Sequence, residues 1–220
     1  MTTTTDTLTC SYLALDAAAR QAREAIADPH RMHQLVMAGY STVTGDAATA
    51  RADHNILYAV DLANRAGMAR LVCQSTATPD WQPLEGVLAA PATIHDGIDL
   101  REGDAIQFRT DLNPVSSTPA PRNPLNPDAP RSRGIRRPIR NLAEQLAWAQ
   151  RKLTDAGLDI TGLSIAAERT LISTAKQGMK VNVTTFTGTA TVTDPDRLAT
   201  ARRTGIGRAK AYGCGLLLLR

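Results

Sequence analysis

Two histidines near the start of a predicted helix, His30 and His33, have the side-chain chemistry for proton transfer. Histidine has an ordinary pKa of about 6.5, so it can take up or release a proton near neutral pH. Asp28 and Pro29 precede the pair and are typical of a helix N-terminus, with aspartate as the N-cap and proline at the first helical position. Such an N-terminus also favours a bound phosphate.

The predicted helix runs to about Gly39, and its apolar face consists of Met32, Leu35 and Val36. At about 100° per residue the two imidazoles lie within about 60° of each other, away from that face. The spacing alone favours two solvated surface histidines. A His-x-x-His metal site is a third interpretation, but no carboxylate or cysteine cluster completes it.

A second candidate site is the glycine-rich stretch at residues 205–215, where two Gly-x-Gly pairs enclose two basic residues. The glycines are Gly205, Gly207, Gly213 and Gly215, and the basic residues are Arg208 and Lys210. Glycine allows positive φ and close backbone approach, so such a loop suits a polyanion. The stretch matches neither a Walker loop nor a dinucleotide fingerprint. The alternative is a plain glycine-rich turn between a helix and a strand.

Positive charge is concentrated in two segments of this 220-residue chain, whose net charge is only +4. Residues 197–220 hold five arginines and one lysine with no acidic residue. Residues 114–140 hold six arginines and one acidic residue: Arg122, Arg131, Arg133, Arg136, Arg137 and Arg140, with Asp128. Two separate basic segments favour a nucleic-acid partner over a solvated loop.

The remaining composition predicts a protein without metal, cofactor or disulfide. The three cysteines, Cys10, Cys73 and Cys214, are far apart and include no Cys-x-x-Cys pair. Residues 1–9 lack the features of an export signal, and the longest aliphatic run, residues 216–219, is too short to span a bilayer. We therefore expect a cytoplasmic protein with no membrane partner.

The first half of the chain predicts the order strand, helix, strand, strand. A strand at residues 8–15 shows period-two alternation, and a polar stretch leads to the helix after Asp28. A loop at 45–55 precedes two strands, 56–62 and 70–75, which a short connection at 64–67 joins as a hairpin. Residues 84–95 fit a short helix and a last strand.

The same order recurs in the second half. We expect strands at 105–112, 163–173 and 181–192, and a last strand at 216–219 buried on both faces. Residues 114–140 contain seven of the twelve prolines and predict a long loop with little regular structure. A helix at 141–156 has Leu142, Leu146, Ala149 and Leu153 on one face and ends at Gly157, and Asp194 starts another helix.

Two successive units of this kind predict an α+β protein of tandem ferredoxin-like domains, residues 1–98 and 99–220. A four-stranded sheet of this topology is also an RNA-recognition scaffold. The fold alone does not determine the activity.

Five motifs in order make the chain resemble the CRISPR repeat-processing endoribonucleases of type I-E systems, the CasE family within the RAMP superfamily. They are Asp28-Pro29-x-x-x-His33, Leu71-Val-x-Gln-Ser75 with Pro79-Asp80-Trp81, Phe108-Arg-x-x-x-Asn113-Pro114, Phe186-x-Gly188, and Gly205-Ile-Gly-Arg-x-Lys-x-Tyr-Gly-x-Gly-Leu-Leu217. The resemblance covers nearly the whole chain.

The resemblance implies a tandem ferredoxin-like enzyme that binds the hairpin of a CRISPR repeat transcript and cuts at its 3′ base without metal. It implies that the product stays bound and that the protein is a subunit of the Cascade complex. His33 is then the expected catalytic residue, and His30 a proton donor or phosphate contact. Lys176 or Lys180 would stabilise the developing charge, and the arginines and the glycine loop would bind RNA.

The chain departs from the family pattern at two positions. His30 stands where the family often has tyrosine, and Gln34 stands where it often has arginine. Two hypotheses therefore remain: a metal-independent endoribonuclease, or a non-catalytic RNA-binding subunit of the same superfamily. His33 at helical spacing after Asp28 favours the enzyme, because a passive binder would not require it.

Overall fold

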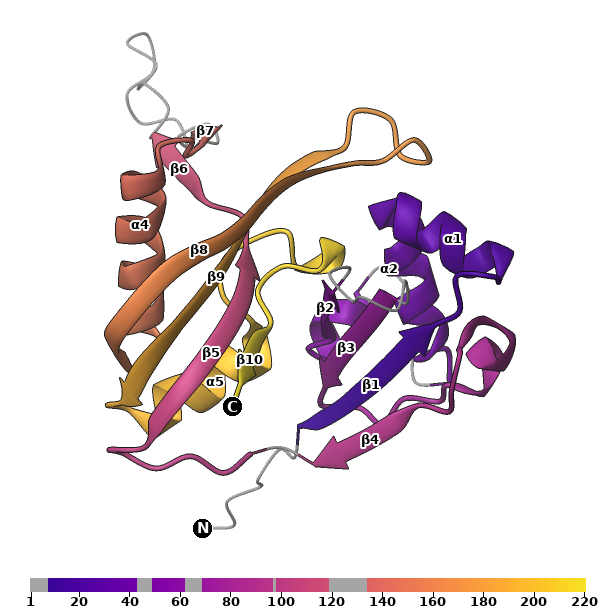
Figure 1. The fold of residues 1–220 in the computed structure, drawn as a ribbon, viewed down its shortest axis with the longest axis horizontal. Coiled ribbons are helices and arrows are strands. Elements are labelled where there is room, and N and C mark those ends of the chain that lie inside the picture. The colour runs from indigo at the N-terminus through magenta and orange to yellow at the C-terminus, as the bar shows by residue number, and fades with distance from the viewer. Residues whose placement is uncertain (1–7, 43–48, 62–68, 97, 119–133) are drawn as a thin grey trace, which may run out of the picture.

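The computed structural model describes residues 8–42, 49–61, 69–96, 98–118 and 134–220. Within these residues the chain forms two four-stranded antiparallel sheets and a separate two-stranded ribbon. Each four-stranded sheet has the ferredoxin-like strand order, so the predicted tandem ferredoxin-like fold is confirmed. Figure 1 shows the two sheets side by side, with their helices on the outer faces.

The first sheet has the order β2-β3-β1-β4. Its strands are β1 (Thr9–Leu15), β2 (Leu57–Asp61), β3 (Ala69–Ser75) and β4 (Thr93–Asp96), and a 3₁₀ helix, η1 (Gln82–Val87), precedes β4. Alternation in β1 turns Leu13 and Leu15 into the core and leaves Tyr12 on the open face. The predicted β2–β3 hairpin is confirmed, although its connection lies outside the described residues.

Two consecutive helices cover this sheet, α1 (Arg20–Ala27) and α2 (Pro29–Ala38). The predicted helix α2 is confirmed, with Met32, Leu35 and Val36 buried. Helix α1 occupies the predicted polar stretch, and the residues that it buries are only two alanines, whose apolar surface is small. A short helix, α3 (Ala50–Asp53), interrupts the predicted loop at 45–55.

The second sheet has the order β10-β5-β9-β8. Its strands are β5 (Ala105–Leu112), β8 (Leu158–Ile172), β9 (Lys180–Val192) and β10 (Leu217–Leu219), and its helices are α4 (Leu142–Asp155) and α5 (Pro195–Thr204). A further 3₁₀ turn, η2 (Lys210–Tyr212), lies between α5 and β10. Strands β8 and β9 extend past the sheet as an arm that reaches over α1 and α2 (Figure 1).

Four details of the second half differ from the sequence prediction. Strand β8 begins at Leu158 rather than at residue 163, because bulges near Gly162 and Ala167 interrupt the alternation. Residues 114–140 are not simply a loop, since β6 (Val115–Thr118) pairs with β7 (Ile135–Pro138) in an antiparallel ribbon.

The other two differences concern burial. Leu142 is 54% exposed at the first turn of α4, and the core takes Gln145 and Trp148 together with Ala149 and Leu153. Strand β10 is an edge strand in which Leu217 is buried, whereas Leu218 and Leu219 are only half-buried. The apolar run therefore did not mean burial on both faces.

The two halves pack directly against each other. Leu57 and Ala59 from β2 form a buried cluster with Leu216, which precedes β10. The Tyr58 hydroxyl donates to the Ala211 carbonyl at 2.9 Å, and Asp61 pairs with Arg109 at 3.3 Å. Each sheet has its own core, and the division between residues 98 and 99 stays a proposal. No helix in the described ranges is long and apolar enough to cross a membrane.

Candidate active site

Both candidate histidines lie where the first half of the chain meets the second. His30 and His33 are half-buried rather than free on the surface, and the Nδ1 atom of each is buried without a hydrogen-bond partner. The ring of His33 lies edge-on to the ring of Tyr212, with centroids 6.4 Å apart and an interplanar angle of 66°. The seam between the domains therefore places His33 against the end of the glycine loop.

Cationic groups surround His33 on several elements. Burial lowers the pKa of His33 below its ordinary value, and the charges of His30, Arg51 and Lys176 lower it further. Arg51 comes from α3, is itself half-buried, and donates to the Ile56 carbonyl at 3.3 Å. A lowered pKa keeps His33 neutral at neutral pH, and the same cations favour an anionic ligand.

Asp28 joins the helix that carries the histidines to the β8–β9 arm. As the N-cap of α2, its carboxylate accepts the backbone N–H groups of His30 at 2.8 Å and Arg31 at 3.3 Å. Its other oxygen accepts the N–H groups of Thr174 at 2.8 Å and Ala175 at 3.0 Å. Burial by itself would raise the pKa of Asp28, but these bonds outweigh it and hold the pKa well below its usual range.

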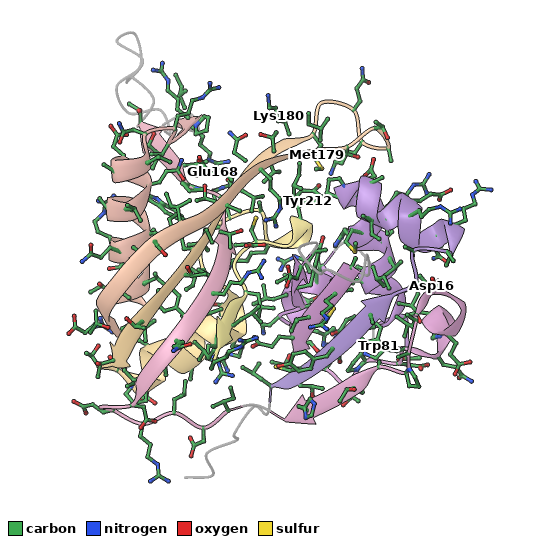
Figure 2. All side chains as sticks on the ribbon, in the orientation of Figure 1. Asp16, Trp81, Glu168, Met179, Lys180 and Tyr212 are labelled. Atoms are coloured by element: carbon green, nitrogen blue, oxygen red, sulfur yellow. The ribbon has the colours of Figure 1, made fainter. Side chains whose placement is uncertain are left out.

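The same network fixes the backbone around Lys176. The Ser173 hydroxyl donates to Asp28 Oδ1 at 2.8 Å and accepts the Lys176 N–H at 2.8 Å. The exposed Lys176 side chain then reaches Tyr212, with Nζ 3.2 Å from the phenol oxygen. Figure 2 shows Tyr212 beneath the β8–β9 arm, in which β9 begins at Lys180. Lys176 is thus brought near His33, and its charge lowers the pKa of that histidine, whereas Lys180 is exposed at the start of β9.

The glycine loop is positioned mainly by packing. A Cβ at Gly205 would lie 2.8 Å from the Leu57 side chain, and one at Gly213 would lie 3.1 Å from Tyr58. A Cβ at Gly215 would lie 2.7 Å from the Ile206 carbonyl. Gly207 alone among the four is exposed, with φ at +75°. Gly205, Gly213 and Gly215 therefore let the loop pack closely within the protein. Gly207 gives the exposed part of the loop its backbone conformation.

The two basic residues of this loop differ in their surroundings. Arg208 is exposed, whereas Lys210 is half-buried and donates to the Thr204 carbonyl at the end of α5 at 2.6 Å. Burial and the nearby Arg51 lower the pKa of Lys210. Arg208 is consequently the loop cation with a side chain free to approach a ligand from solvent.

Of the six arginines predicted to bind RNA in residues 114–140, three lie within the described chain. Arg136 and Arg137 are exposed on β7, and Arg140 is exposed just before α4. Arg122, Arg131 and Arg133 lie outside the described residues. The ribbon stands at the end of the second domain away from α2 (Figure 1), so the arginines and the histidines form two separate regions.

Two cavities lie between the two domains. One, of about 330 Å³, lies between α2 and the β8–β9 arm and is lined by Met32, Tyr58, Arg169, Ile172 and Tyr212 among others. A larger one, of about 790 Å³, lies between the open faces of the two sheets, and neither candidate histidine lines either cavity. Tyr212 lines the smaller cavity and also contacts His33. The smaller cavity is therefore the one next to the candidate catalytic residues.

Sequence reasoning missed three residues of this site: Asp28 as a link between domains, Arg51 and Tyr212. Asp28 and Tyr212 both lie within the quoted motifs, but their partners Ser173 and Lys176 are far along the chain. Arg51 fell in a stretch predicted as loop. Across the described residues, no group of three or more His, Cys, Asp or Glu side chains could hold a metal ion.

Comparison with known proteins identifies relatives over nearly the whole chain. A family model described as CRISPR associated protein matches residues 10–220. The CRISPR-associated endoribonuclease Cse3 of Thermus thermophilus is 26% identical over 222 residues, which cover 93% of this chain and 96% of that protein. The Cascade subunit CasE of Escherichia coli is 29% identical over 168 residues, covering 76% of this chain and 82% of CasE.

The structural comparison agrees. A structure of Thermus thermophilus Cse3, bound to an RNA representing a pre-cleavage complex, superimposes with a TM-score of 0.79. The two proteins are 25% identical, and the match covers 97% of this chain and 98% of the other. The chain therefore belongs to this family of CRISPR-associated proteins, and Cse3 and CasE are among its relatives.

Proposed function

We propose that this protein is a metal-independent endoribonuclease that binds the hairpin of a CRISPR repeat transcript and cuts at the 3′ base of that hairpin. Two observations support the proposal. The relatives carry the names endoribonuclease and Cascade subunit, and one was solved with a pre-cleavage RNA. The half-buried His33 also lies against Tyr212 and Lys176 from the other domain, and this apposition carries the argument.

The reaction that fits this arrangement uses the RNA as its own nucleophile. A base removes the proton of the ribose 2′-hydroxyl, and the 2′-oxygen attacks the adjacent phosphorus. The bond from phosphorus to the 5′-oxygen breaks, and an acid gives that oxygen a proton. The products are a 2′,3′-cyclic phosphate and a 5′-hydroxyl, with no redox change and no added water.

The residues divide between proton transfer and charge stabilisation. His33, largely neutral because its pKa is lowered, can accept the 2′-hydroxyl proton. His30, one turn earlier on the same helix, is the second group able to carry a proton. Lys176 supplies positive charge for the phosphorane oxygens. Lys180 is the weaker candidate for that role, since no hydrogen bond in the described part of the chain holds its side chain near Tyr212, as one does for Lys176.

RNA binding would come from regions beyond the histidines. A-form RNA is recognised largely through its shape and phosphates, and the exposed cations Arg136, Arg137, Arg140 and Arg208 suit that purpose. The proposal includes retention of the cleaved RNA and assembly with other Cascade subunits, as the name of CasE indicates for that relative. The cytoplasmic location stays a prediction.

The direct test incubates the protein with a repeat hairpin RNA in excess EDTA. The expected result is a single defined cut, at the same rate as without EDTA. The same hairpin with a 2′-deoxyribose at the nucleotide before the cut should bind but stay intact. Binding without any cut of the all-ribose hairpin, with or without divalent metal, would instead assign the chain the non-catalytic RNA-binding role.

A further inference from the structure

Tyr212 occupies a position that neither the histidine motif nor the basic segments explain. It ends the 3₁₀ turn η2, on the second domain, and is half-buried at the seam with α2. Its ring is the one that lies edge-on to His33 at 6.4 Å. Figure 2 labels it beneath the β8–β9 arm.

The hydrogen bond between Tyr212 and Lys176 has only one possible direction. A lysine ammonium has three donors and no acceptor, so Lys176 Nζ donates and the phenol oxygen accepts, at 3.2 Å. The phenol proton is therefore not used in this bond. No acceptor for it is found within the described part of the chain, so the Tyr212 hydroxyl can donate to a ligand.

The ammonium also lies at the hydroxyl edge of the ring, since its nitrogen is 5.9 Å from the ring centroid. An N–H donor and an O–H donor from two segments of the second domain thus border the same space as the imidazole of His33. A phosphodiester carries two non-bridging oxygens that can each accept a hydrogen bond. Two adjacent donors beside a proton-transfer group match that ligand.

We propose that Tyr212 is a catalytic residue whose hydroxyl donates a hydrogen bond to a non-bridging oxygen of the scissile phosphate, next to Lys176. The inference rests on the cleavage reaction proposed above. Negative charge on the non-bridging oxygens grows as the phosphorane forms, so a fixed donor there stabilises the transition state more than bound RNA. The half-buried position strengthens this hydrogen bond, because the local dielectric is lower than in water.

The first test replaces Tyr212 by phenylalanine, which keeps the ring against His33 and removes only the hydroxyl. In single-turnover cleavage of the repeat hairpin by the full chain, Tyr212→Phe should be roughly ten- to a hundred-fold slower. Its Kd for a non-cleavable hairpin with a 2′-deoxy substitution should stay within about threefold. The matched control is Tyr12→Phe, the same change at a tyrosine on the open face of β1.

The second test asks whether the hydroxyl touches the phosphate. Sulfur is a weak hydrogen-bond acceptor, so a phosphorothioate at the scissile position should slow the wild-type protein for one of its two stereoisomers. In Tyr212→Phe that isomer should cause little further slowing, because the bond it weakens is already absent.

Two outcomes would overturn the proposal: a wild-type rate for Tyr212→Phe, or an unchanged stereospecific sulfur effect in a slow Tyr212→Phe. The second would reduce Tyr212 to a packing role. The failure of the proposed cleavage reaction is distinct from both, since it would appear as wild-type cleavage by His33→Ala.

Discussion

The hydroxyl of Ser173 donates to both carboxylate oxygens of Asp28, at 2.8 and 3.0 Å, across 145 residues of sequence. One side chain thereby caps the helix that carries His33 and anchors the turn that carries Lys176. The histidines and the lysine come from different domains. Their relative position therefore depends on this buried carboxylate.

Replacing Asp28 by alanine should reduce both stability and cleavage. The loss of an N-cap costs about 0.5–2 kcal/mol, and each buried donor left unpaired adds about 1–3 kcal/mol. We expect the free energy of unfolding to fall by at least about 3 kcal/mol, and the single-turnover rate to fall even at temperatures where the variant is folded. Denaturant unfolding and cleavage of the repeat hairpin measure the two effects.

Asp194→Ala is the matched control, because Asp194 also precedes a proline and caps a helix, α5. Its carboxylate bonds only near its own helix, to the Arg197 N–H at 3.0 Å and to the Arg197 side chain at 3.2 Å. This variant should lose about 1 kcal/mol and keep its cleavage rate. Equal effects from the two variants would mean that Asp28 is an ordinary cap.

His33→Ala should abolish cleavage and leave the affinity for the hairpin within a few-fold. A proton-transfer group acts mainly in the transition state, where it typically contributes about 10²–10⁴-fold in rate. His95→Ala is the control, since His95 is an exposed residue of β4 whose ring contacts Tyr12. His30→Ala should be milder; an equal loss from both variants would mean that the two imidazoles act as a pair.

The sequence predicted those parts of the site that local patterns encode. Asp28 and Pro29 start α2 through interactions within one turn, so both the helix and the place of His33 on it could be inferred. Strand β8 was predicted too short because its bulges break the alternation that marks a strand. Helix α1 was missed because its buried residues are only alanines, Ala22 and Ala25.

Contacts between residues far apart in the sequence had no such signal. Lys176 and Tyr212 are 36 residues apart, and their bond joins the turn between β8 and β9 to the 3₁₀ turn η2. The same holds for Arg51, whose effect on His33 follows from burial in the seam rather than from any spacing. A charge count could find the basic segments, but not which cations remain exposed, as the contrast between Arg208 and Lys210 shows.

Arg51→Met should move the pH dependence of cleavage toward higher pH. The Arg51 cation disfavours the protonated form of His33 and so lowers its pKa. Removing that charge raises the pKa, and the limb of the rate profile that reports His33 shifts upward whether His33 acts as base or acid. The control is Arg151→Met, a change on the exposed face of α4, which should leave the pH profile unchanged. An unchanged profile for Arg51→Met would mean that His33 is not the titrating group.

The arginines of β7 should contribute unequally to RNA binding. Arg136 and Arg137 pair with Ser117 and Ser116 in the ribbon, and adjacent residues of a strand point to opposite faces. We expect the double alanine variant to bind more weakly and to flatten the plot of log affinity against log salt. Each lost phosphate contact should change the slope by roughly one unit or a little less, and one single variant should account for most of the effect.

Gly207→Ala provides the uncharged comparison for that experiment. The positive φ of Gly207 is strained for alanine, so the exposed part of the glycine loop should change shape and binding should weaken. The salt slope should stay nearly intact, since no charge is lost. A wild-type slope in the double arginine variant would instead mean that the ribbon does not contact the RNA.

The chemical end of the 5′ fragment tests the proposed reaction most directly. The hairpin is cleaved by the wild-type protein in excess EDTA, and the mass of the 5′ fragment is measured. Attack by the 2′-hydroxyl, with His33 and Lys176 as the acting groups, predicts a 2′,3′-cyclic phosphate or its hydrolysis product. A fragment ending in a 3′-hydroxyl would contradict the account, because that end results from water attack of the kind that metal ions assist.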